Sequence, residues 1–343
     1  MVHWPIQHPP LFTNPNLTPV YSTLWGRDGS QWERPATLPD NDPDTPWQAL
    51  RDFTNVGYMG GAAPLPDYPV WKNLTEFGGL PDDDQSDVAA LRAALAACPP
   101  NQAIFLPAGR YIIDEQIILD DSMNNIVIRG ASRDTTILLF PKHTREILGK
   151  PKTVAPMIIL RGGEKRGLEH LYLAFRDNQK GTGYFREPGA TKQFEPHWFY
   201  TGEWALWLEK AENHSWLRDI RIYNSNHGIM VTDRGTNFNT IVDVVLDQFW
   251  QRRGVDGNSV GHFDIEIHDG AKRNLFHNIL LTGNFAHDIS PMGCQYNVFS
   301  RITTRWSLKL DHHAKGNQYN LFTEVNTGTG GRGWGEHQNN FRE

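Results

Sequence analysis

A 23-residue repeat in the C-terminal half limits what this chain can fold into more than any other feature. Segments that begin Asn-hydrophobic-Phe recur at this spacing, at Asn274, Asn297 and Asn320. A glycine stands four residues before each asparagine. Asn239 begins an earlier segment of the same kind, and Ser215 takes the asparagine place one segment before that.

A period of about 22 residues is typical of a β-helix coil made of three strands and three turns. Neighbouring coils lie about 4.8 Å apart, so an asparagine at the same turn of each coil can bond the next one. The Phe two residues later and the Ile or Val five residues later are expected to point inward and stack. A leucine-rich repeat would need Leu-x-x-Leu-x-Leu spacing, which these segments lack. We therefore expect an all-β chain forming a single right-handed parallel β-helix.

The N-terminal part divides into an arm and a capped first coil. Residues 1–66 are rich in Pro, Trp and Asp without helical or strand periodicity, and we expect an irregular arm packed on the main domain of residues 67–343. The spacing of Val88, Leu91 and Leu95 predicts a short helix. Ser86 or Asp84 can cap it, and it would cover the exposed end of the sheet in the first coil.

Three segments between residues 70 and 140 carry a family resemblance. They are Asn73–Asp83, Ser86–Leu91 and Phe105–Tyr111, the last reading Phe-Leu-Pro-Ala-Gly-Arg-Tyr. Together they resemble the opening of the pectate-lyase-like β-helix superfamily. This resemblance implies the β-helix fold. It implies no particular reaction, because the superfamily contains lyases, glycoside hydrolases, epimerases and phage tailspikes.

Later segments, from Trp204 onward, resemble an uncharacterised bacterial subgroup of the same superfamily, from which no catalytic residue can be carried over. The motifs of polygalacturonases are not reproduced, and Gly261-His262-Phe263 is only partly similar to one of them. The calcium signature of pectate lyases is not found either.

The overall balance of charge and hydrophobicity excludes some classes of partner. A formal net charge of -6 argues against nucleic acid, which needs a basic surface. No stretch approaches the roughly 20 apolar residues of a membrane span. The first residues are not a signal peptide, yet a secreted or periplasmic protein is expected from the kind of substrate considered below. Cys98 and Cys294 lie in segments of different character, so two buried thiols are expected rather than a disulfide framework.

The strands that precede the repeated glycines contain the candidate catalytic residues. Aligning them on Phe263, Phe285 and Leu308 as inward residues sends the intervening side chains outward. The expected outward set is a column of Glu266, Asp288 and Asp311, flanked by His268, Ser290 and His313, with Lys309 on the same face. His287 and His312 take the inward parity, where a core histidine is the more common role.

Stacked carboxylates allow two chemistries. Neighbours about 5 Å apart match a retaining glycosidase, whereas the outer pair, two coils apart, matches the wider inverting separation. Alternatively, Asp288 and Asp311 bind a metal ion such as Ca²⁺, which neutralises a uronate carboxylate. His313, His268 or Lys309 would then remove the C5 proton in a β-elimination. The expected substrate contacts are Arg301, Arg305, Lys315, Trp198 and Tyr200, the last two in an aperiodic loop.

The sequence therefore favours a polysaccharide lyase acting on an acidic, uronic-acid-containing polysaccharide. A glycoside hydrolase using the stacked carboxylates is the first alternative. A non-catalytic glycan-binding or tailspike-like module is the second. No cofactor other than Ca²⁺ is suggested, and assembly into a homo-oligomer such as a trimer stays open.

Overall fold

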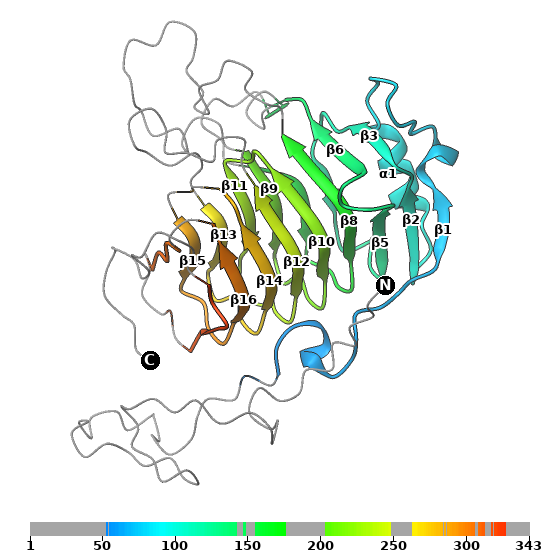
Figure 1. The fold of residues 1–343 in the computed structure, drawn as a ribbon. Helices are drawn as coiled ribbons and strands as arrows, with labels where there is room; N and C mark the ends of the chain where they lie inside the picture. Colours follow the sequence, from blue (N-terminus) through cyan, green and yellow to red (C-terminus); the bar gives the residue numbers. More distant parts are fainter. Residues whose placement is uncertain are drawn as a thin grey trace, which may run out of the picture.

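Successive strands stack side by side along one axis in the computed structural model, and each coil pairs in parallel with the coils before and after it (Figure 1). The structure describes residues 53, 55–142, 147–148, 155–175, 203–247, 263–283, 285, 287–305, 308–312, 317 and 319–326. The predicted all-β, right-handed parallel β-helix is confirmed.

Two sheets make up the helix. The larger contains β1 (Val70–Asn73), β2 (Gln102–Leu106), β3 (Gly109–Ile112), β5 (Ile126–Gly130), β6 (Thr136–Phe140), β8 (Gly167–Phe175), β10 (Trp216–Tyr223), β12 (Thr240–Asp247), β14 (Leu275–Leu281), β16 (Val298–Thr304) and β17 (Leu321–Thr323). The smaller contains β4 (Ile117–Leu119), β7 (Ala155–Arg161), β9 (Glu203–Glu209), β11 (His227–Val231), β13 (Phe263–His268) and β15 (His287–Met292). All assigned strand pairs are parallel, and apolar side chains from both sheets fill the space between them.

The long strands of the larger sheet bend at the same place in each coil. The bend residue has left-handed backbone geometry, with φ between 55° and 58° at His170, Asp219, Asp243, Asn278 and Arg301. These residues drop out of the paired register, while the residues on either side stay paired. A non-glycine residue in this region is strained. Here the pairing of adjacent coils holds each bend in place.

The asparagine ladder is confirmed. The side-chain N–H of Asn239 donates to the Asn274 carboxamide oxygen at 3.0 Å, and Asn274 and Asn297 repeat the bond to the next asparagine at 3.1 and 3.0 Å. Each acceptor oxygen also takes the backbone N–H of the previous asparagine. The phenylalanines stack as predicted, with ring centroids 4.7 Å apart for Phe276–Phe299 and 4.5 Å for Phe299–Phe322.

The predicted helix covers the first coil as α1 (Val88–Ala97), burying Leu91, Ala94 and Leu95 (Figure 1). Its N-cap is Asp87 rather than Ser86 or Asp84. The Asp87 carboxylate accepts the backbone N–H of Ile112 at 2.7 Å instead of capping the helix. Burial raises the pKa of Asp87 to about 6.

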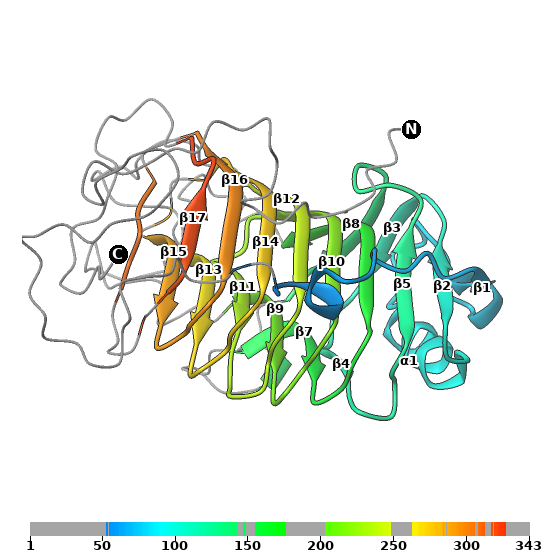
Figure 2. The same ribbon diagram turned by 90° about the horizontal axis from the view of Figure 1, so that it is seen from below.

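The last residues of the expected arm lie on the outer face of the larger sheet, where Figure 2 shows them crossing β10 and β12. The backbone N–H of Gly57 donates to the Arg273 carbonyl at 2.8 Å, and that of Tyr58 donates to the Thr240 hydroxyl at 2.7 Å. The Tyr58 ring packs edge-on against Trp216, with centroids 5.4 Å apart. Residues 1–52 lie outside the described part of the chain.

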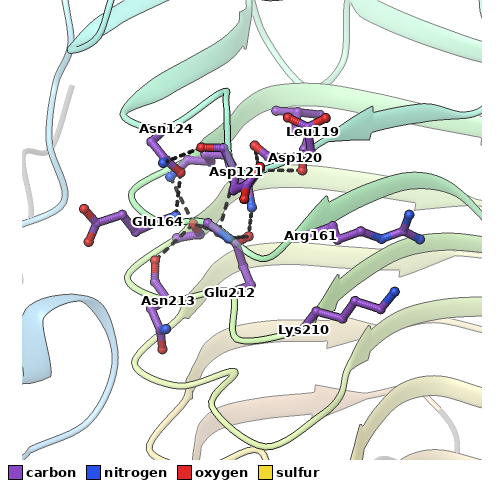
Figure 3. Close-up of polar contacts among 12 residues, drawn as sticks. Leu119, Asp120, Asp121, Asn124, Arg161, Glu164, Lys210, Glu212 and Asn213 are labelled. Carbon is purple, nitrogen blue, oxygen red and sulfur yellow. Dashed lines mark hydrogen bonds and ion pairs between the residues drawn. The ribbon is translucent and has the colours of Figure 1, made fainter.

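An ion pair occupies the ladder position of an earlier coil. Arg166, in register with Ser215, is fully buried and pairs with buried Glu212. Its guanidinium also donates to the carbonyls of Leu119 and Asp120. Burial lowers the pKa of Arg166 to about 10, so it stays charged at neutral pH. Figure 3 shows the surrounding turns, where Glu164, Asn124 and Glu212 lie close together. These contacts hold adjacent turns together, and we assign them a structural role.

No helix among the described residues is long and apolar enough to cross a membrane.

Candidate functional site

The outer face of the smaller sheet carries two carboxylates in one column. Glu266 pairs with Ser290 in the next coil, and the bridge between Ile289 and Leu310 places Asp311 in register after Ser290. The column lies outside the core, whereas the adjacent Ile265, Ile289 and Leu310 point into it. Glu266 is 2% exposed and Asp311 is 1% exposed.

Each carboxylate lies beside imidazole groups. Glu266 Oε1 is 3.2 Å from His268 Nε2, and Glu266 Oε2 is 3.9 Å from His227 Nδ1. Asp311 Oδ2 is 3.5 Å from His287 Nδ1 and accepts the Ser290 hydroxyl at 3.3 Å. The face thus combines two buried acids with three imidazole groups.

The separation of the two acids follows from the coil spacing. They stand two coils apart, which corresponds to about 9.5 Å between their backbones. The residue between them is Ser290, whose small side chain is the only one that the column places between the acids. The predicted two-coil pair is therefore present as Glu266 and Asp311.

The expected position of Asp288 in this column is wrong. Asp288 aligns with Asp264 in the preceding coil and Lys309 in the following one, because the register pairs Ile265 with Ile289 and Ile289 with Leu310. Earlier members of this second column, Met157 and Ala205, belong to the hydrophobic core. Asp288 consequently sits in an inward-facing column, and the adjacent pair that a retaining glycosidase needs is not formed by Glu266 and Asp288.

The inward acids are in an unusual environment. Neither carboxylate oxygen of Asp264, which is 0% exposed, has a hydrogen-bond partner within the part of the chain that the structure describes. Burial, followed by the charge of Asp288, raises the pKa of Asp264 well above its ordinary value. Burial also raises the pKa of Asp288 to about 7, against the lowering effects of the Lys309 charge and backbone N–H.

Of the other predicted residues that the structure describes, Lys309 and Arg301 make their contacts away from the two carboxylates. The Lys309 ammonium donates to the Phe285 carbonyl, and Lys309 belongs to the inward column rather than to the outer face. Arg301 lies on the larger sheet, where it pairs with Glu324 at 2.6 Å. Arg305 directly follows the end of β16. His313, Lys315, Trp198 and Tyr200 are not among the described residues.

The inward placement expected for His287 is also wrong. His287 aligns with Phe263, His227 and Trp204 in an outer aromatic column next to the acids. The His287 and Phe263 rings stack with centroids 4.9 Å apart. His227 was not predicted at all, and its place in a strand one coil before Glu266 is the signal that could have revealed it. His312 takes the inward parity that was expected, and burial lowers its pKa.

A metal role was predicted for Asp288 and Asp311, with Ca²⁺ as the candidate ion. The register separates these two residues into an inward and an outward column. Within the described ranges, no three His, Cys, Asp or Glu side chains are placed to hold a metal ion together.

Comparisons with known proteins agree with the fold. Residues 71–148 match the family model described as rhamnogalacturonase A/epimerase, pectate lyase-like. A polygalacturonase from Erwinia carotovora ssp. carotovora is similar in structure with 11% identity and a TM-score of 0.54, over 77% of this chain and 71% of that one. The Azotobacter vinelandii mannuronan C-5 epimerase AlgE6 A-module has 13% identity and a TM-score of 0.49, over 74% of this chain and 63% of that module's length. No curated protein sequence matches the chain.

Proposed function

For a chain with the pectate-lyase-like right-handed parallel β-helix fold, we propose the function of a polysaccharide-cleaving enzyme, and specifically of a glycoside hydrolase that inverts the anomeric centre. The observation that carries the proposal is the outer column in which Glu266 and Asp311 stand two coils apart. A backbone spacing of about 9.5 Å is close to the carboxylate separation of inverting enzymes, which is about 6.5–9.5 Å. That separation leaves room for the glycosidic bond and one water molecule.

In the proposed reaction, Glu266 is the general acid and Asp311 the general base. Glu266 gives its proton to the glycosidic oxygen as the bond from that oxygen to C1 breaks. Asp311 takes a proton from water as the water oxygen bonds to the opposite side of C1. We assign the acid role to Glu266 because His268 and His227 lie beside it and can return its proton.

A lyase acting on a uronic-acid-containing polysaccharide is the second candidate, and the histidines favour it. His268 and His287 each lie within 3.5 Å of a carboxylate, which could orient an imidazole to remove a C5 proton. We rank the lyase second because Lys309, a candidate base, and Arg301, an expected substrate contact, are directed elsewhere.

The test is incubation with neutral, uronic and sulfated polysaccharides while reducing ends and the ultraviolet absorbance of unsaturated products are followed together. The proposal predicts reducing ends alone, with proton NMR showing the inverted anomer first. Rising absorbance would replace it with elimination. Saturable binding without either product would favour the glycan-binding or tailspike-like alternative.

Such a substrate lies outside the cytoplasm, so we also propose secretion or a periplasmic location. Assembly into a homotrimer remains a proposal that light scattering can decide.

A further inference from the structure

Two tryptophans lie in the columns that contain the candidate catalytic groups. Trp207 aligns with Met230 and then with Glu266, while Trp204 aligns with His227 and then with Phe263. The Trp204 ring stacks on His227 with centroids 4.0 Å apart and meets Trp207 edge-on at 5.6 Å. Trp207 therefore stands two coils, about 9.5 Å, from Glu266 along the helix axis.

Neither indole N–H group donates a hydrogen bond to any residue that the structure describes. Each nitrogen is shielded from solvent, and no hydrogen-bond acceptor for either lies in the described ranges of the chain. Trp204 itself is only 3% exposed. A buried donor without an acceptor costs about 1–3 kcal/mol, and native structures leave few of them. A ligand with hydrogen-bond acceptors would supply the missing partners of these two neighbouring donors.

The surroundings of Trp207 are apolar and electrically balanced. Ile159 and Met230 flank Trp207 in its own column, and both are buried. The nearest cation of the same strands, Arg161, is paired with Glu209 at 2.5 Å. A ligand here meets hydrogen-bond donors and aromatic surface rather than a charge that would select a carboxylate. Sugar units offer hydroxyl oxygens together with apolar C–H faces.

We propose that Trp204 and Trp207 form a subsite for a neutral sugar unit of the substrate, two coils on the N-terminal side of Glu266. The indole N–H groups donate to sugar hydroxyl oxygens, and the ring surface packs against the sugar C–H face. The inference rests on the proposed function for its substrate and adds that this substrate is a neutral polysaccharide. Asp311 on the same face, ionised as the general base, would also repel a polyanionic chain.

The experiment measures binding without turnover, in a Glu266→Gln background. Calorimetry and tryptophan fluorescence follow titration with neutral gluco-, galacto- and manno-oligosaccharides and with oligogalacturonate and oligomannuronate of equal length. Trp207→Phe keeps an aromatic ring and removes the N–H, and Trp204→Phe does the same at the neighbouring site. The matched control is Trp71→Phe in β1, whose ring packs on Phe77 at the other end of the helix.

We expect a neutral oligosaccharide to bind more tightly than either uronate. Trp207→Phe should weaken its binding about tenfold, which corresponds to one lost hydrogen bond to a buried donor. Trp71→Phe should bind as the background does, and thermal melts should show all variants folded. Unchanged affinity in both subsite variants, or tighter binding of a uronate, would overturn the inference. If Trp207→Phe weakens binding but the wild type cleaves no substrate, the subsite is supported and the proposed hydrolase activity is contradicted.

Discussion

Lys309 follows Asp288 in an inward column of the β-helix, and its backbone N–H donates to the Asp288 carboxylate at 2.6 Å. The Lys309 charge also favours ionised Asp288, yet burial outweighs both effects and raises the pKa. Interior positions of the same column hold Met157 and Ala205 in earlier coils. The last coils therefore hold ionisable groups where earlier coils hold apolar side chains, so the stability of the fold should depend on pH.

The free energy of unfolding should fall as pH rises. Asp288 has a folded-state pKa of about 7 against an ordinary value of 3.8, so the folded protein holds more protons between these limits. Ionisation of this one group then costs on the order of 4 kcal/mol by pH 8. Asp288→Asn, which keeps the acceptor oxygen, should flatten the decline. Denaturant titrations from pH 4 to pH 8 measure it, with exposed Asp121→Asn as control. An unchanged slope in Asp288→Asn would assign the pH dependence to other groups.

Asn297→Ala should destabilise the fold by about 2–4 kcal/mol. It removes the bonds to Asn274 and Asn320 and leaves the buried Asn274 backbone N–H without its acceptor. Thr303→Ala in β16, the strand that follows Asn297, alters an exposed side chain and should shift stability by no more than about 0.5 kcal/mol. Chemical denaturation of both variants provides the comparison. Similar values for the two would show that the ladder contributes little.

The Arg166–Glu212 pair should tolerate joint replacement better than single replacement. Arg166→Met leaves the fully buried Glu212 carboxylate without its counter-charge and should cost about 3–5 kcal/mol. Arg166→Met combined with Glu212→Leu removes both charges and should recover a large part of that loss. Melting temperatures of the three variants and the wild type form a double-mutant cycle. A double variant as unstable as the sum of its parts would mean that the two side chains do not act as a pair.

The strand register places Asp311 on the outer face and Asp288 in an inward column, so the two should differ in the proposed reaction. Asp311→Asn should lower kcat by about a thousandfold or more, because it removes the proposed base. Asp288→Asn should stay within about tenfold of the wild type, since Asp288 faces inward in another column. Initial rates on the substrate found in the polysaccharide screen, measured at pH 6, separate the two. Equal losses in both variants would restore the three-carboxylate arrangement that the sequence suggested.

The asparagine ladder was predictable from the sequence, whereas the arrangement of the candidate catalytic residues was not, for one physical reason. From Asn274 to Asn320 the ladder keeps a constant spacing, because differences in the length of the connecting segments cancel within each coil. In the smaller sheet the same differences do not cancel, so Ile289 follows Ile265 by 24 residues and Leu310 follows Ile289 by 21. The sequence alignment through Phe263, Phe285 and Leu308 is therefore out of register, and it assigns several side chains to the wrong column.

Arg166 shows a second limit. It occupies the ladder position one coil before Ser215, where nothing in the sequence resembles the asparagine segments. Only the strand register reveals that a charged group has taken the place of an amide.

Because the coils repeat at one spacing, the distance between Glu266 and Asp311 can change only in steps of one coil. Adding one complete coil between β13 and β15 would move the two acids apart by one strand spacing, from about 9.5 Å to about 14 Å. The same coil added between β10 and β12 would lengthen the protein without changing that distance. Evolution or engineering can thus extend the binding surface freely on one side of the acids, while the segment between them admits no change in the number of coils.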